Sequence, residues 1–145
     1  METTEVVDHV VQDHRIIHAR LAEWEAALRQ LTASTFSESQ RGLQRVWRLV
    51  PFFEKEVSRH FRDEETRLFP AVTTQNPDSQ KALARFAGEH NEFSRQWRAF
   101  KRELLYCDAE GETRRVCELG TGLICLLRRH MRDEEQELLP LVGKS

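Results

Sequence analysis

An eleven-residue motif occurs twice in this chain of 145 residues, at an offset of 70 positions. The copy that begins at His60 reads HFRDEETRLFP, and the copy that begins at His130 reads HMRDEEQELLP, so seven of the eleven positions are identical. In each copy a glutamate, Glu64 or Glu134, follows the histidine by four residues. Residues four apart lie on the same face of an α-helix, so each pair can bind one ion. The repeat predicts two such helix faces that the rest of the fold brings together.

Hydrophobic residues recur along the whole chain in alternating steps of three and four, the period of amphipathic α-helices. This pattern predicts four helices, at residues 4–32, 38–70, 77–108 and 112–141. Only six glycines and four prolines are present, fewer than a β-rich fold requires. We therefore expect a single all-α domain over residues 1–145, an up-down-up-down antiparallel four-helix bundle. Pro51 is expected to kink the second helix or to mark a local irregularity, and Pro70 to end it.

Each predicted helix carries a histidine on its apolar face, and two of the helices also carry a glutamate there. These residues are His14, His60, Glu64, His90, His130 and Glu134. For neighbouring helices, the midpoint in sequence between two of these residues falls in the loop that joins the helices. Antiparallel helices should therefore carry the six groups at the same height, within roughly one turn or 5 Å.

Six ionisable groups that converge in an apolar core indicate metal binding. A buried carboxylate costs several kcal/mol unless it is paired or bound to a metal. The alternative to metal binding is a network of Glu–His hydrogen bonds within the protein. Four imidazoles and two carboxylates exceed the four ligands of a zinc site. They match a dinuclear centre in which Glu64 and Glu134 bridge two ions. This ligand mixture favours iron, with manganese and zinc as alternatives. Because both halves contain a histidine followed by His-x-x-x-Glu, the sequence indicates an internal duplication with pseudo-twofold symmetry.

In these features the chain resembles the hemerythrin-like, or HHE cation-binding, domains over nearly its whole length. The resemblance rests on the segments Asp13-His14-Arg-Ile-Ile, His60-Phe-Arg-Asp-Glu64-Glu-x-x-Leu-Phe-Pro70, Glu89-His90-Asn-Glu-Phe and His130-Met-Arg-Asp-Glu134-Glu-x-x-Leu-Leu-Pro140. It implies a non-haem di-iron site with an oxo or hydroxo bridge or a water. It also implies that the metal ligands are His14, His60, Glu64, His90, His130 and Glu134.

Two positions depart from the pattern of the oxygen-carrying hemerythrins. Those proteins have a second histidine four residues after the third-helix ligand, where this chain has Ser94. They end with His-x-x-x-x-Asp, where this chain has His130-x-x-x-Glu134. One imidazole fewer leaves a position for water or a small ligand, which favours oxidation chemistry or reactions with nitric oxide or peroxide over reversible oxygen carriage.

Other polar residues lie close to the six candidates. Asp13 and Glu89 each precede a candidate histidine and are candidates for orienting an imidazole on a neighbouring helix. Glu65 and Glu135 point away from the histidine face and are expected to be surface charges. His18, one turn beyond His14, is either a further ligand, a hydrogen-bond donor near the site or a boundary residue. The hydrophobic residues expected to form a dry wall around the site are Ile17, Phe53, Val57, Phe86, Phe93, Leu126 and Leu127.

Composition and charge exclude several other classes of protein. The chain is 39% hydrophobic and 32% charged, typical of a globular protein, and its net charge of −2 gives no argument for nucleic acid or an anionic membrane as partner. It contains no apolar run of roughly 18 residues and no secretory signal at its start. Its three cysteines lack C-x-x-C spacing. These features predict a reduced, cytoplasmic protein.

Three functions remain open from the sequence. The first is binding of a small diatomic gas. The second is an enzyme, a di-iron oxidoreductase that acts on oxygen, peroxide or nitric oxide with an electron-donor protein as partner. The third is iron storage, delivery or repair, or a structural domain with two zinc ions. The fold alone does not decide among them.

Overall fold

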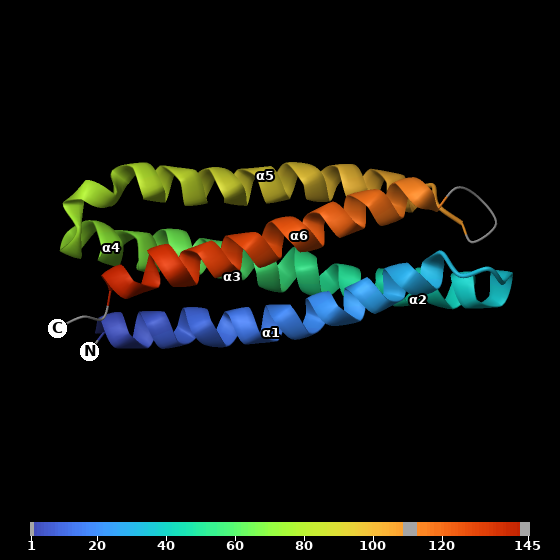
Figure 1. Cartoon of the computed structure of the whole chain (residues 1–145), viewed down its shortest axis with the longest axis horizontal. Coiled ribbons are helices and arrows are strands. Elements are labelled where there is room, and N and C mark those ends of the chain that lie inside the picture. Colours follow the sequence, from blue (N-terminus) through green and yellow to red (C-terminus); the bar gives the residue numbers. More distant parts are fainter. Residues whose placement is uncertain (1, 109–112, 143–145) are drawn as a thin grey trace.

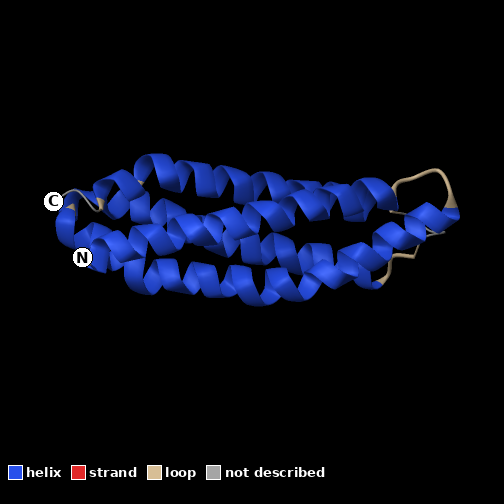
Figure 2. Ribbon diagram, turned by 90° about the horizontal axis from the view of Figure 1, so that it is seen from below, coloured by secondary structure: helices blue, strands red, loops and turns tan. Residues whose placement is uncertain are grey.

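The computed structural model describes residues 2–108 and 113–142, and this part of the chain is helical without strands. Four helical rods pack antiparallel, as Figures 1 and 2 show, so the prediction of an all-α four-helix bundle is confirmed. The rods are α1 (Glu2–Leu31), the interrupted rod 36–75, α5 (Gln80–Leu105) and α6 (Arg114–Glu137). α1 begins and α6 ends at the same end of the bundle (Figure 1). No described helix is long and apolar enough to cross a membrane.

The second rod contains two π-helical turns. It runs through α2 (Phe36–Phe52), η1 (Phe53–Val57), α3 (Ser58–Asp63), η2 (Glu64–Leu68) and α4 (Phe69–Gln75). Pro51 lies two residues before η1. Because proline has no N–H and its ring crowds the preceding turn, a local change of hydrogen bonding is expected there. The prediction of an irregularity at Pro51 is confirmed.

The predicted end of this rod at Pro70 is wrong, since the helix continues to Gln75. In η2 the N–H of Phe69 bonds to the carbonyl of Glu64, five residues back, which is the π-helical pattern. Pro70 then lies in the first turn of α4, where a missing N–H costs no hydrogen bond. In the second copy of the motif, Pro140 lies in a short 3-10 helix, η4 (Leu139–Leu141), and the rod ends there.

The other helix ends lie close to the predicted ones. Thr35 caps α2 by accepting a hydrogen bond from the backbone N–H of Glu38, so the helix begins at residue 36 rather than 38. A 3-10 turn, η3 (Pro77–Ser79), precedes α5, which ends three residues before the predicted residue 108. The predicted start of the fourth helix, residue 112, lies outside the described residues.

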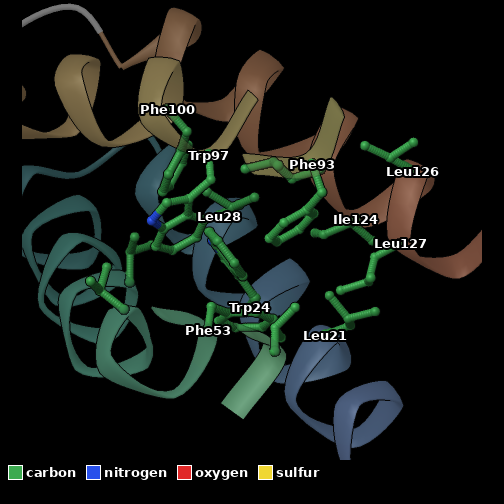
Figure 3. Packing of buried hydrophobic residues seen from close by; sticks show 14 of the residues in the cluster. Leu21, Trp24, Leu28, Phe53, Phe93, Trp97, Phe100, Ile124, Leu126 and Leu127 are labelled. Carbon is green, nitrogen blue, oxygen red and sulfur yellow. The ribbon is translucent and has the colours of Figure 1, made fainter. Parts of the chain in front are cut away.

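Two hydrophobic clusters fill the bundle, one on each side of the histidine level. The smaller cluster contains Val10, Leu68, Phe86 and Leu138. The larger contains Ile17, Phe53 and Phe100. Figure 3 shows Trp24, Phe53, Trp97 and Phe100 gathered between the rods, and the Trp24 ring centroid lies 4.2 Å from that of Phe53 and 5.1 Å from that of Phe100. The residues expected to form the dry wall are all buried, namely Ile17, Phe53, Val57, Phe86, Phe93, Leu126 and Leu127.

Candidate metal centre

All six side chains singled out in the sequence lie together, in the gap between the two hydrophobic clusters. Their exposed fractions are between 0% and 3%, for His14, His60, Glu64, His90, His130 and Glu134. Each of the four rods contributes at least one of them, at the same height in the bundle. The heights predicted from the sequence are therefore those of the structure.

The ligand atoms form two overlapping groups of four. One group contains His14 and His60, the other contains His90 and His130, and both contain Glu64 and Glu134. Within each group the candidate ligand atoms lie within 4.8 Å of one another. Because the two carboxylates belong to both groups, they are placed to bridge two ions, with a pair of histidines at either side.

The inner atoms, Nε2 of the histidines and the carboxylate oxygens, face one another at short range. His60 Nε2 lies 2.7 Å from a Glu64 oxygen, and His90 Nε2 lies 2.8 Å from the other. His14 Nε2 lies 3.0 Å from one oxygen of Glu134, and His130 Nε2 lies 3.4 Å from the other oxygen. Each glutamate therefore contacts a histidine from each half of the chain.

Three of these inner atoms are fully buried and make no hydrogen bond of acceptable geometry within the protein. They are His60 Nε2, Glu64 Oε2 and Glu134 Oε2. Buried polar atoms in folded proteins are almost always satisfied, so an unsatisfied cluster requires an explanation such as an ion. Imidazole nitrogens and carboxylate oxygens are donors that iron, manganese and zinc accept. The donor set fits a dinuclear metal site.

A second layer of four carboxylates lies outside the histidines. Each accepts a hydrogen bond from an Nδ1–H: Asp13 from His60 at 3.0 Å, Glu89 from His130 at 2.7 Å, Glu135 from His14 at 2.6 Å and Glu65 from His90 at 2.7 Å. With Nδ1 of each ring bonded to one of these carboxylates, Nε2 faces the inner cluster. We call these four residues the outer carboxylates. They follow the repeat, because Glu65 and Glu135 are equivalent, as are Asp13 and Glu89.

Half of this outer layer was not expected from the sequence. Asp13 and Glu89 do orient imidazoles on neighbouring helices, as proposed for them. Glu65 and Glu135 were expected to be surface charges, and their side chains are indeed 49% and 42% exposed, but their hydrogen bonds to His90 and His14 were not foreseen. Their stems lie at the bundle surface while their carboxylates reach a histidine on the next rod. The signal in the sequence was the second glutamate, present in both copies of the motif.

In the protein without metal, the inner groups perturb one another's protonation. Burial alone would lower the pKa of His14, but hydrogen bonds to Glu134 and Glu64 outweigh it and raise the pKa to about 10. The pKa of His130 is raised for the same reasons. Burial and the adjacent charge of Glu64 raise the pKa of Glu134. Despite burial, the pKa of Glu64 is held low by a hydrogen bond with Glu134 and by the surrounding histidines. A cation that enters the site must therefore displace protons.

Two further histidines lie outside both groups of four. Burial and the nearby charge of His14 lower the pKa of His18, which joins neither group. His9 forms a third group with Asp13 and Asp63. The guanidinium of Arg59 already contacts both of those carboxylates, at 3.2 and 2.8 Å, so a cation occupies that position.

The fold and the site together define a four-helix-bundle protein with a buried His/Glu cluster that fits a dinuclear metal site. The sequence model of the Hemerythrin HHE cation binding domain family matches residues 4–142. The chain belongs to this family, and the resemblance seen in its motifs is confirmed. Searches of curated proteins and of solved structures found no match.

Proposed function

We propose that this chain is a non-haem di-iron protein that binds or reacts with a small oxidant such as oxygen, peroxide or nitric oxide. The proposed ligands are the six inner residues, with Glu64 and Glu134 as bridges. The observation that carries the proposal is the pair of overlapping four-atom groups, buried and with three atoms left without hydrogen bonds. When bound, two iron ions would supply redox chemistry at open coordination positions.

The protein's own residues support this function in two ways. The outer carboxylates hold a proton at Nδ1 of each histidine and leave Nε2 free for a metal. The apolar clusters on both sides keep bulk water away from the site and favour small, uncharged reactants. A redox function also implies an electron-donor protein as partner.

The size of the reactant is limited by the walls around the site. A hollow of about 290 Å³ lies between the second rod and α5, lined by Phe61, Phe93 and Trp97 among others. None of the six inner residues lines it, and the ring of Phe61 lies between it and His90. A diatomic molecule or peroxide is the reactant class that such packing can admit.

The test begins with protein purified from cells grown without added metal. Metals per chain are counted by mass spectrometry, and visible spectra are recorded before and after reduction and after exposure to oxygen, peroxide or nitric oxide. Two irons per chain with an oxidant-dependent band support the proposal. A colourless protein with two zinc ions contradicts it, and iron that is released on reduction without a reaction indicates storage or delivery.

Variants locate the site. His60→Ala and Glu134→Ala should each lose metal, because each removes a donor from a buried group of four. His9→Ala is the matched control, since His9 lies beside Asp13 but belongs to neither of those groups. If both site variants retain two metals per chain, the ligand set is wrong.

A further inference from the structure

The two halves of the candidate centre have the same donors but different apolar surroundings. Two phenylalanine rings stack with the imidazole of His90. Phe61 is stacked on it with ring centroids 4.0 Å apart and planes at 12°, and Phe69 lies at 5.7 Å and 14°. His14, the equivalent residue in the first half, has one ring contact among the described residues, an edge contact with His60 at 5.0 Å.

The repeat shows that this difference is systematic. Phe61 and Phe69 occupy the positions of Met131 and Leu139 in the second copy of the motif. His14 and His90, the two site histidines outside the repeated motif, are 76 residues apart. At the same offset, Phe86 and Phe93 correspond to Val10 and Ile17. All eight of these side chains are buried. Three of these four aromatic rings, those of Phe61, Phe69 and Phe86, contact His90 or His130. Among the described residues, the one phenylalanine ring near the His14–His60 half is again that of Phe61, with its centroid 6.1 Å from that of His60.

The outer carboxylates do not offset this difference at His14 and His90. Glu135 bonds to His14 at 2.6 Å and Glu65 bonds to His90 at 2.7 Å, and both carboxylates belong to half-exposed side chains. The hydrogen bonds on Nδ1 are thus nearly equal. Of these two histidines, His90 alone has aromatic rings stacked on it among the described residues, and parallel aromatic contacts of this kind are favourable beyond the area they bury.

The other equivalent histidines, His60 and His130, differ in how firmly their outer carboxylates are held, and here the first half is held more firmly. Asp13, which holds His60, is more deeply buried than Glu89, which holds His130, and is also bound by Arg59 at 3.2 Å. The weakly supported ligand is therefore His14 rather than His60.

We infer that Phe61 is a positioning residue for His90, and that the His90–His130 position holds its metal ion longer than the His14–His60 position. This inference rests on the proposed dinuclear function. It assigns the two positions different roles. The ion at His14–His60 exchanges first and has the looser ligand, and the ion at His90–His130 is retained.

The first experiment compares equivalent ligands across the repeat. Protein is loaded anaerobically with two Fe²⁺ per chain, and release to the chelator ferrozine is followed by absorbance. We expect two phases in the original chain. His14→Ala should lose the fast phase and keep the slow one, and His90→Ala should lose the slow phase. The opposite assignment, or a single phase for both ions, overturns the inference.

The second experiment tests Phe61 itself. Phe61→Leu should speed the slow phase by about 2- to 10-fold, the range expected for loss of one aromatic contact. Phe61→Tyr keeps the ring and should keep the slow rate. Met131→Leu, at the equivalent buried position, is the control for a general loosening of the core and should leave the slow phase unchanged. Equal acceleration in Phe61→Leu and Phe61→Tyr overturns the positioning role.

A third readout uses the protein without metal, so that it is independent of the proposed function. Rings stacked at 4.0 Å shift the proton resonances of His90 upfield. This shift should persist in Phe61→Tyr and become smaller in Phe61→Leu, where only the more distant ring of Phe69 remains stacked. Fewer than two Fe²⁺ per chain in the original protein would contradict the proposed function, whereas a His90 resonance that does not respond to Phe61→Leu contradicts the positioning role.

Discussion

The packing of α1 against α2 makes a sharp prediction at Gly42. A Cβ atom at this buried position would lie 2.3 Å from the backbone nitrogen of Leu31, 2.7 Å from the carbonyl carbon of Gln30 and 2.8 Å from the carbonyl oxygen of Ala27. Ordinary contact begins at 3.4 Å, so the two helices would have to separate by about 1 Å. All three neighbours are backbone atoms, which cannot turn aside as a side chain can.

The expected cost of Gly42→Ala follows from two opposing contributions. Overpacking of a close-packed contact costs about 1–3 kcal/mol, and rigid backbone neighbours place this case at the upper end. Replacing glycine by alanine inside a helix returns about 1 kcal/mol. We expect a net loss of about 2 kcal/mol in the free energy of unfolding. For a chain of this length that lowers Tm by about 4–8 °C.

Gly88→Ala is the matched control. Gly88 also lies inside a helix, and a Cβ there would meet nothing within 4 Å. Only the helix contribution remains, so this variant should be more stable by about 0.5–1 kcal/mol. Thermal unfolding and urea titration of both variants, followed by circular dichroism, give the two values. The reasoning about close packing is refuted if Gly42→Ala unfolds at the same temperature as Gly88→Ala.

The metal count separates this effect from the site. Ala27, which Gly42 approaches, is 13 residues from His14 along α1, or roughly 20 Å. The separation of α1 from α2 should stay local to that end of the bundle. Folded Gly42→Ala should therefore still bind two metals per chain, as measured by mass spectrometry.

Three further predictions concern the site. Asp13→Asn should weaken metal binding about 10- to 100-fold in a chelator competition, because it removes the carboxylate that is hydrogen-bonded to His60. The control is Glu92→Gln, which should bind metal normally, because the carboxylate of Glu92 pairs with Arg95 at the surface of α5. Without metal, the folded pKa of His14 of about 10 lies above its value of about 6.5 in the unfolded chain, so its stabilising contribution is complete below pH 6.5 and is lost as the pH rises toward 10. The urea midpoint of metal-free protein should fall between pH 7 and 9.5, and an unchanged or rising midpoint contradicts this. Metal uptake at pH 7 should release protons from His14, His130 and Glu134, whose pKa values are raised. Calorimetry in buffers of different ionisation enthalpy measures this release. Uptake without proton release would show that these groups are not protonated.

The sequence was sufficient to predict the fold and to find the six inner residues, because both predictions depend on the regular spacing of hydrophobic residues along α-helices. The spacing of hydrophobic residues gives the inward face of each helix, and His14 and His90 stand out because they interrupt it. The heights follow from the antiparallel arrangement, since loop position and helix rise determine which residues are neighbours. These properties depend on backbone geometry that four regular helices share.

The features that the sequence did not reveal lie where backbone geometry is irregular or where side-chain length matters. The second rod continues beyond Pro70 because the hydrogen bonding in η2 is π-helical. A π-helical turn cannot be recognised from the spacing of hydrophobic residues. Glu65 and Glu135 lie about 140° around the helix from the histidine that starts their motif, a direction that predicts exposure. That argument concerns the Cα–Cβ direction, whereas a glutamate carboxylate extends several ångströms further and can reach the next rod.

The two layers of carboxylates explain why the motif contains consecutive glutamates. The first, Glu64 or Glu134, points inward beside the histidine of its own helix. The second, Glu65 or Glu135, bonds to the lone histidine of the other half, since Glu65 contacts His90 and Glu135 contacts His14. Each copy of the motif therefore orients a histidine that lies in the other half of the chain. A single half would contain a glutamate without its histidine and a histidine without its glutamate, so the centre requires both halves to be packed together.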